Sequence, residues 1–333
     1  MFLLIDGNNL AWAGFYALER AMKPDTQERR ERVATLGLAS TVLGAIARDG
    51  DAPGGSKPMP AQRVAICFDE GRPLRRRQIF PAYQTGREGD PKFIQNESTI
   101  LGAIEGFAQM ASKMLPFEVV RGTNTEADDL IAGLVHAAPD ITKRIVSTDR
   151  DFLQLIDSHT SVYAPVRKLV IDESNFFDAA APKTSAGVPI SFPRERFLDY
   201  RALIGDPSDN LPGVPGVGPL SAAKLLAAAP LDDYIGEPAA FRAVNAVRAA
   251  LGRKSDAVER AFVDGSAAAV IERNRTLMDL RLPAPCWSQL DELTQRGRWD
   301  RATFEAWYRE EKITAVEEAA LFGRLESLAS AGA

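Results

Sequence analysis

Residues 2–9, FLLIDGNN, open the chain with four apolar residues, then Asp6, then a turn sequence of glycine and asparagine. A short apolar run that ends in a turn is typical of a strand buried on both faces. Further strands of this kind are predicted at residues 63–69 (RVAICFD), 118–120 (EVV), 144–149 (RIVSTD) and 161–166. Such strands lack polar alternation and are separated by helical stretches such as 10–21 and 31–48. They predict an α/β fold with a mostly parallel central sheet flanked by helices.

Acidic residues follow three of these strands at the point where each strand ends. They are Asp6, Asp69 and Asp149, with Asp151 two residues further on. Parallel strands place their carboxyl ends at one edge of the sheet, where α/β proteins form their sites. We therefore expect these side chains to lie close together.

Residues 125–132, TEADDLIA, predict a helix that begins at the same edge. Thr125 is followed three residues later by Asp128. This spacing is typical of an N-cap with an acidic partner, a variant of the capping box. The first turn then carries Glu126, Asp128 and Asp129. Carboxylates also stabilise a helix N-terminus without any other role, so their assignment to a site depends on the acids at the strand ends.

Composition restricts the chemistry that these acids can perform. The chain has 333 residues and a formal net charge of −5, and it has neither an apolar run of membrane-spanning length nor a secretory signal. Its only histidines, His136 and His159, make a Ser-His-Asp or Cys-His mechanism and a histidine-rich zinc site improbable. Cys67 and Cys286 are far apart in sequence, which favours reduced thiols in a cytoplasmic protein.

Clustered carboxylates repel one another unless cations neutralise them. Oxygen ligands without histidine favour magnesium or manganese over zinc. Six or more acids suit two ions about 4 Å apart, the arrangement that assists phosphodiester cleavage. The residues alone thus predict a two-metal phosphodiester hydrolase.

A Gly/Pro hairpin follows two more acids, Asp206 and Asp209. Residues 211–218 (LPGVPGVG) lead into a helix with Pro219 in its first turn. Glycine lets backbone N–H groups approach phosphates, and Lys224 adds a charge about one turn later. An ordinary turn between helices explains the same sequence, but its position after the two acids favours DNA-backbone binding.

Residues 72–87 combine basic and aromatic side chains. Arg75, Arg76 and Arg77 could pair with phosphates, and Tyr83 could stack on a base. A solvated charged face is an equally good interpretation. The stretch from here to residue 117 has no strand signal, so we expect it to project from the sheet.

In combination these motifs resemble the 5′-nuclease superfamily of flap endonucleases, bacteriophage 5′–3′ exonucleases and the 5′-nuclease domain of bacterial DNA polymerase I. The resemblance covers roughly residues 2–230. It is carried by LIDGNN (4–9), CFDEGRPLRRR (67–77), the E-x-D-D turn (126–129), the T-D-x-D turn (148–151) and G-D-x-x-D-N (205–210). A helix-three-turn-helix hairpin follows the last motif.

The resemblance implies a PIN-like core, a helical arch at residues 80–117 and two Mg²⁺ or Mn²⁺ ions, with a K⁺ ion at the hairpin. The nine metal-binding acids would be Asp6, Asp69, Glu126, Asp128, Asp129, Asp149, Asp151, Asp206 and Asp209. The first ion would lie nearer Asp6, Asp69, Glu126 and Asp128, and the second nearer Asp149, Asp151, Asp206 and Asp209. Arg87 and Arg201 would be the catalytic basic residues. DNA-binding positions would be Arg75, Arg76, Arg77, Tyr83, Gln84, Gly213, Val214, Gly216, Val217, Gly218, Ser221 and Lys224.

Two positions depart from the family pattern. Relatives usually have lysine at the position of Gln84 and often have arginine at that of Ala13. Both departures remove positive charge that would stabilise the transition state at the scissile phosphate. We expect Arg87, or one of the arginines at 75–77, to compensate in part.

We therefore expect a freestanding, monomeric 5′ nuclease that cleaves DNA at flaps, nicks and ends, and RNA in RNA–DNA hybrids, leaving 5′-phosphate and 3′-hydroxyl ends. The expected domains are a nuclease core (1–180), a hairpin region (181–235) and a C-terminal helical region (236–333). One alternative is a structure-specific DNA-binding protein that has lost catalysis. Another is a phosphotransferase that forms an aspartyl-phosphate at Asp149 or Asp151.

Overall fold

The computed structural model describes residues 1–51, 59–235, 247–249 and 256–331, which form two compact units. Unit 1 comprises Met1–Pro73, Pro91–Asp172 and Arg281–Ala333, and unit 2 comprises Leu74–Asp90 and Glu173–Leu280. Both the expected arch segment (80–117) and the expected C-terminal region (236–333) are divided between the units. Residues 236–246 and 250–255 of the latter lie outside the described residues.

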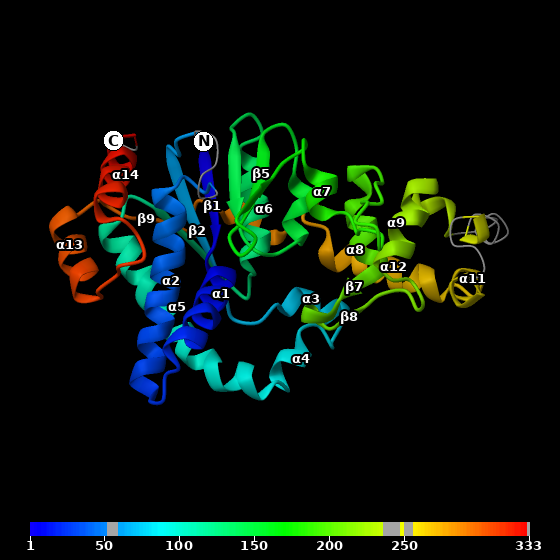
Figure 1. The fold of residues 1–333 in the computed structure, drawn as a ribbon, viewed down its shortest axis with the longest axis horizontal. Helices are drawn as coiled ribbons and strands as arrows, with labels where there is room; N and C mark the ends of the chain where they lie inside the picture. The colour runs from blue at the N-terminus through cyan, green and yellow to red at the C-terminus, as the bar shows by residue number, and fades with distance from the viewer. Residues whose placement is uncertain (52–58, 236–246, 250–255, 332–333) are drawn as a thin grey trace. The chain divides into compact units, whose positions relative to one another are not determined.

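Unit 1 is built on a seven-stranded sheet with the order β6-β5-β4-β1-β2-β3-β9 (Figure 1). The strands are β1 (Phe2–Asp6), β2 (Arg63–Glu70), β3 (Glu118–Thr123), β4 (Lys143–Val146), β5 (Thr160–Ala164), β6 (Leu169–Ile171) and β9 (Thr294–Arg296). Strands β1 to β5 run parallel to their neighbours, and β1 lies between β2 and β4. The predicted mostly parallel sheet is confirmed, and each of its five strands overlaps a predicted range, but β4 ends at Val146, so Asp149 lies in the loop after the strand and not at its end.

The two edge strands were not predicted. β6 pairs antiparallel with β5, and β9 pairs antiparallel with β3. β6 has three residues, and β9 consists of Thr294, Gln295 and Arg296, so neither gives an apolar signal. Their strand conformation follows from pairing with a neighbour that is already in place.

Helices cover both faces of this sheet. The elements of unit 1 are α1 (Gly7–Met22), α2 (Gln27–Ala47), α5 (Pro91–Met114), α6 (Ala127–Ala137), α13 (Arg301–Glu310), α14 (Glu318–Ala331) and the 3₁₀ turns η1 (Asp151–Leu155) and η6 (Pro285–Gln289). Leu3 and Ile5 of β1 point into a core shared with α1, α2 and α5. Side chains alternate along a strand, so Leu4 faces the opposite side, where α6 packs on β1, β2 and β3.

The C-terminal half of α5, which the expected arch segment includes, packs on the core of unit 1. Ile100, Ile104, Phe107 and Ala111 lie on one face of the helix and are buried in the core against α2. This spacing of apolar residues is that of an amphipathic helix lying on a core. The C-terminal part of α5 is therefore a structural layer of unit 1.

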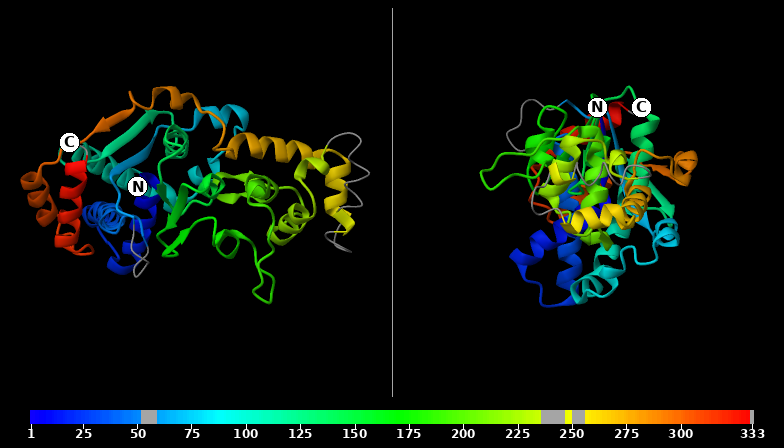
Figure 2. Two further views of the ribbon diagram at one scale, coloured as in Figure 1. Left: turned by 90° about the horizontal axis from the view of Figure 1, so that it is seen from above. Right: turned by 90° about the vertical axis from the view of Figure 1, so that its right-hand side faces the viewer.

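The C-terminal segment returns to unit 1 and completes it. β9 lies beside β3, and α13 and α14 pack against α5 and α2 (Figure 2). Phe304, Tyr308 and Phe322 form an aromatic cluster within this core. Residues 281–331 are thus part of the same fold as the strands that end in acids.

Unit 2 is mainly helical. Its elements are α3 (Leu74–Ile79), α4 (Thr85–Glu88), α7 (Phe176–Ala180), η2 (Arg194–Arg196), α8 (Phe197–Ile204), β7 (Gly205–Asp206), η3 (Pro207–Asp209), β8 (Leu211–Pro212), α9 (Pro219–Ala228), η4 (Leu231–Asp233), α11 (Asp256–Val263) and α12 (Ser266–Met278). The predicted hairpin between two helices is present: it connects α8 to α9, and Pro219 is in the first turn of α9. The buried Asn274 of α12 supports it by donating to the carbonyls of Ala202 (2.9 Å) and Pro212 (3.1 Å).

Candidate functional site

Asp6 ends β1 and caps helix α1. Its Oδ1 accepts a hydrogen bond from the backbone N–H of Asn9 (3.1 Å), and its Oδ2 accepts one from the Ser147 hydroxyl (2.7 Å). The residue is only 4% exposed. Burial, together with the nearby Asp69 carboxylate, raises the pKa of Asp6 to about 7. The end of β1 therefore holds a carboxylate that is costly to ionise.

Asp69, near the end of β2, caps helix α6. Its Oδ1 accepts a hydrogen bond from the backbone N–H of Ala127 (2.7 Å). The prediction that Thr125 caps this helix is wrong, because its hydroxyl donates to the carbonyl of Thr123 (3.3 Å) and the N-cap position is Glu126. The cap comes from the neighbouring strand, an arrangement that the local sequence pattern does not encode.

Asp128 shows that the acids of unit 1 gather at one edge of the sheet. Its pKa is raised well above the usual value by burial and then by the carboxylates of Asp149, Asp6, Glu126 and Asp69, in that order. These five residues come from four separate stretches of sequence. Five of the seven predicted metal-binding acids of unit 1 are therefore close enough to interact electrostatically.

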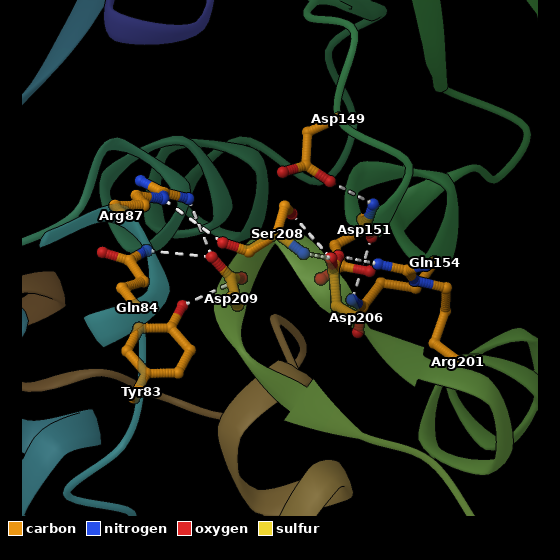
Figure 3. Close-up of polar contacts among 10 residues, drawn as sticks. All are labelled: Tyr83, Gln84, Arg87, Asp149, Asp151, Gln154, Arg201, Asp206, Ser208 and Asp209. Atoms are coloured by element: carbon orange, nitrogen blue, oxygen red, sulfur yellow. Dashed lines mark hydrogen bonds and ion pairs between the residues drawn. The ribbon is translucent and has the colours of Figure 1, made fainter. Parts of the chain in front are cut away.

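The loop after β4 carries the remaining acids of this edge. The Asp149 carboxylate accepts from the backbone N–H of Asp151 (2.7 Å), and the Asp149 N–H donates to the Ser147 hydroxyl (3.0 Å). Gln154 donates to the carbonyl of Asp151 (2.9 Å) (Figure 3). Asp151 is buried at the start of η1. The T-D-x-D turn is thus held by its own backbone and by Ser147.

Two asparagines hold the strand ends together, and sequence reasoning missed their role. The Asn8 side-chain oxygen accepts from the Asp69 N–H (3.0 Å). The Asn9 side-chain oxygen accepts from both the N–H and the hydroxyl of Thr148 (2.8 Å each). The signal was the pair of amides directly after Asp6, which we interpreted only as a turn. They fix the ends of β2 and β4 relative to β1.

Asp206 and Asp209 belong to unit 2 and are held by side chains and backbone groups of the same unit. Burial would raise the pKa of Asp206, but the adjacent Arg201 guanidinium and hydrogen bonds from Ser208 lower it below the usual value. Arg201 is itself buried. Asp206 is thus held ionised, with Arg201 as its ion-pair partner.

Asp209 accepts hydrogen bonds from three side chains of residues 83–87, as Figure 3 shows. The donors are the Tyr83 hydroxyl (3.2 Å), Gln84 Nε2 (3.1 Å) and Arg87 Nη2 (2.8 Å). Arg87 also donates to the carbonyl of Ser208 (3.3 Å). Residues 83–87 are therefore attached to the η3 turn through Asp209.

The expected DNA-binding residues before this segment have different environments. Arg75 is exposed, and Arg77 forms an ion pair with Glu88 (2.7 Å). Arg76 is buried and donates to the carbonyl of Leu277 (3.0 Å), and Tyr83 is only 3% exposed. Arg76 and Tyr83 thus support the interior of unit 2, and neither offers the open surface that phosphate pairing or base stacking requires.

The hairpin between α8 and α9 presents backbone and small residues outward. Val214 and Val217 are buried, and Gly213 and Ser221 are half-buried. Gly216, Gly218 and Lys224 are exposed. The valines fix the turn from inside, while the exposed glycines and Lys224 remain accessible to a phosphate backbone.

The donors at the acidic edge of unit 1 fit a hard divalent cation. All of them are carboxylate oxygens, and the described histidines, His136 and His159, are exposed elsewhere. The mutual repulsion that raises the pKa of Asp128 is the repulsion that a dication offsets. Within the described ranges, however, no three or more His, Cys, Asp or Glu side chains lie close enough together to hold a metal ion as they stand.

Two other features concern the cysteines and the apolar character of the helices. Cys67 and Cys286 are both free and buried, in agreement with the predicted reduced thiols. Of the helices that the structure describes, none combines the length and apolar character that a membrane span needs.

The fold and the site define a class: an α/β protein with an acidic strand-end site and a helical unit containing a helix–hairpin–helix. The model of the 5′-3′ exonuclease N-terminal resolvase-like domain matches residues 1–181, and that of the 5′-3′ exonuclease C-terminal SAM fold matches residues 192–301. The chain therefore belongs to the 5′–3′ exonuclease family.

Curated relatives include DNA polymerase I of Mycobacterium tuberculosis, 32% identical over 302 residues. The match covers 90% of this chain but 29% of that protein. The thermostable DNA polymerase I of Thermus filiformis is 32% identical over 228 residues, covering 68% of this chain and 23% of the relative. The chain thus spans less than a third of the length of these relatives.

Solved structures share the fold. The T5 D15 protein co-crystallised with metal ions is 14% identical, with a TM-score of 0.58 and coverage of 99% of this chain and 98% of that one. The T5 D15 flap endonuclease in a complex with DNA and metal ions is 15% identical, with a TM-score of 0.58 and the same coverage. At this identity the likeness concerns the fold alone.

Proposed function

We propose that this protein is a divalent-metal-dependent 5′ nuclease that hydrolyses DNA at 5′ ends, nicks and flaps. The observation that carries the proposal is the convergence of acids at one sheet edge: Ser147 hydrogen-bonds to both Asp6 and the Asp149 backbone, and Asp69 accepts from the first residue of α6. Family membership and the DNA-bound T5 D15 flap endonuclease of the same fold support it further.

In this proposal the carboxylates of Asp6, Asp69, Glu126, Asp128 and Asp149 hold the cations, with Mg²⁺ or Mn²⁺ as the expected ions. Bound cations would polarise the phosphodiester and lower the pKa of an attacking water. Hydrolysis adds that water across the P–O bond, and the products are a 5′-phosphate and a 3′-hydroxyl.

The protein's own residues would prepare and hold the substrate. Asn8 and Asn9 fix the strand ends, so that the carboxylates keep their positions during the reaction. The exposed glycines of the α8–α9 hairpin and Lys224 would bind the DNA backbone. Arg87, attached to the η3 turn, would contribute positive charge to phosphate binding.

The test is product sizing on end-labelled 5′-flap, nicked and blunt duplexes with Mg²⁺, beside an EDTA control and the Asp128→Asn variant. We expect short 5′-phosphorylated products from the wild type and almost none in EDTA or from the variant. Cleavage that continues in EDTA, or an Asp128→Asn variant with full activity, would contradict the proposal.

A structure-specific DNA-binding protein without catalysis remains the second candidate. It is favoured by Gln84, which is neutral where relatives usually have lysine and which donates to Asp209. This candidate predicts salt-sensitive flap binding with no product under any metal condition.

A further inference from the structure

We propose that Trp287, in the C-terminal segment, is a positioning residue that holds helix α6 and hence the carboxylates at its start. The inference rests on the proposed function, because it assigns a role to the helix that carries Glu126, Asp128 and Asp129. Both Trp287 and α6 belong to unit 1.

Trp287 contacts α6 at three points along one face of the helix. Its indole Nε1 donates to the carbonyl of Asp129 (2.8 Å). Its ring lies 4.7 Å from the His136 ring, at an interplanar angle of 30°. Between these two contacts lies Gly133, where an added Cβ would be 2.7 Å from Trp287 Cδ1.

The spacing of these contacts shows that the indole lies along the helix. Residues 129, 133 and 136 are four and then three positions apart, which places them on one face of an α-helix. Glycine at 133 leaves the space that the indole occupies. The contact is therefore specific to a flat ring with an N–H donor, which few other side chains could replace.

The first turn of α6 carries carboxylates that repel one another and the other acids of the sheet edge. The pKa of Asp128 is raised by burial and by four neighbouring carboxylates, so electrostatic repulsion acts on this turn. The hydrogen bond from the Ala127 N–H to Asp69 fixes the first residue of the helix. The bond from Trp287 to Asp129 fixes a second point on the opposite side of Asp128 in sequence.

Two fixed points restrict both the tilt of α6 and its rotation about its axis. Displacement of a catalytic group by about 1 Å can lower a rate by about 100-fold. Losing one of the two anchors should produce part of that effect. We expect a threefold to tenfold fall in kcat, the range that corresponds to the loss of one hydrogen bond.

The first test uses Trp287→Phe, which keeps an aromatic ring and removes the N–H donor. We expect KM for a flap duplex to stay within about twofold while kcat falls and the Mg²⁺ concentration for half-maximal rate rises about threefold or more. Gly133→Ala should produce the same pattern, since its Cβ displaces the indole. The matched control is Trp307→Phe. Trp307 lies in the same C-terminal segment as Trp287, and its indole packs on Phe107 and Phe304.

A second readout does not depend on activity. Isothermal titration with Mn²⁺ should show weaker binding, by about threefold or more, in Trp287→Phe and Gly133→Ala but not in Trp307→Phe. Circular dichroism in EDTA should give all four proteins the same folded spectrum at the assay temperature. Rescue of the Mn²⁺ affinity by Trp287→His, which restores a ring N–H donor, would support the hydrogen bond as the cause.

The outcomes separate this inference from the proposed function. Unchanged Mn²⁺ affinity and an unchanged kcat in Trp287→Phe would overturn the positioning role, as would equal losses in Trp307→Phe. A wild-type protein that binds Mn²⁺ but cleaves nothing would contradict the proposed function. In that case the Mn²⁺ titration would still decide whether Trp287 positions the carboxylates.

Discussion

Replacing Asp6 by asparagine should stabilise the metal-free protein at alkaline pH. In the folded chain the pKa of Asp6 is about 7, raised first by burial and then by Asp69 from its usual value of 3.8. An acid with a raised folded-state pKa stays protonated in the folded protein while it ionises in the unfolded chain. Stability is therefore lost as pH rises from about 4 to about 7 and stays low above that range.

The size of this loss follows from the shift in pKa. About 3 units correspond to about 4 kcal/mol at 1.36 kcal/mol per unit, an upper value because the site can relax. Asparagine cannot ionise, and it keeps an oxygen that can accept from the Asn9 N–H. We therefore expect Asp6→Asn to unfold at a Tm about 5–10 °C above the wild type at pH 8 in EDTA, and to lose that advantage near pH 4.

The assay is thermal unfolding followed by circular dichroism at pH 4, 6 and 8, in EDTA and in 10-fold steps of Mg²⁺. Mg²⁺ should stabilise the wild type more than the variant and so reverse their order at pH 8. Asp25→Asn is the matched control, because Asp25 is exposed in a surface ion pair with Arg29. A difference between Asp6→Asn and wild type that does not change with pH would refute the reasoning.

Three further changes test other parts of the molecule. Asn9→Ala removes the acceptor for Thr148, and we expect kcat on a flap duplex to fall by about tenfold or more with DNA affinity unchanged, as measured by single-turnover kinetics and filter binding. Gln84→Lys adds a charge beside Asp209 and should raise the cleavage rate at saturating DNA; an unchanged rate would discard the proposed deficit of positive charge. Asn274→Ala removes the side-chain donor to the Ala202 carbonyl of α8 and one of two donors to the Pro212 carbonyl, so it should lower the free energy of unfolding by about 1–3 kcal/mol in denaturant titrations and weaken DNA binding.

The sheet was predictable because its strands carry their own signal. β1 and β2 are continuous apolar runs, and each ends in an acid at the carboxyl edge. The convergence of the acids then follows from parallel pairing alone. The short edge strands β6 and β9 carry no such signal, because pairing with β5 and β3 determines their conformation.

The contacts of individual side chains were less predictable, because they depend on partners distant in sequence. Thr125 has the residue type and spacing of a cap, yet Asp69 supplies the hydrogen bond from another strand. Arg76 lies in a run of arginines, which favours a solvated or phosphate-binding interpretation. Only the position of α12 shows that its guanidinium is buried against the Leu277 carbonyl.

Several site acids have a structural role in addition to their proposed catalytic one. Asp6 caps α1, Asp69 caps α6, and Asp206 caps the η3 turn. Each side chain thus accepts a hydrogen bond from a backbone N–H at a helix or turn start, which favours negative charge there, although at Asp6 burial and Asp69 outweigh that effect and raise the pKa. Replacement by alanine would remove the cap together with the charge, whereas asparagine can keep an acceptor in place. A loss of activity in an alanine variant of these residues therefore cannot distinguish metal binding from helix capping, and only the asparagine series measures the contribution of the charge.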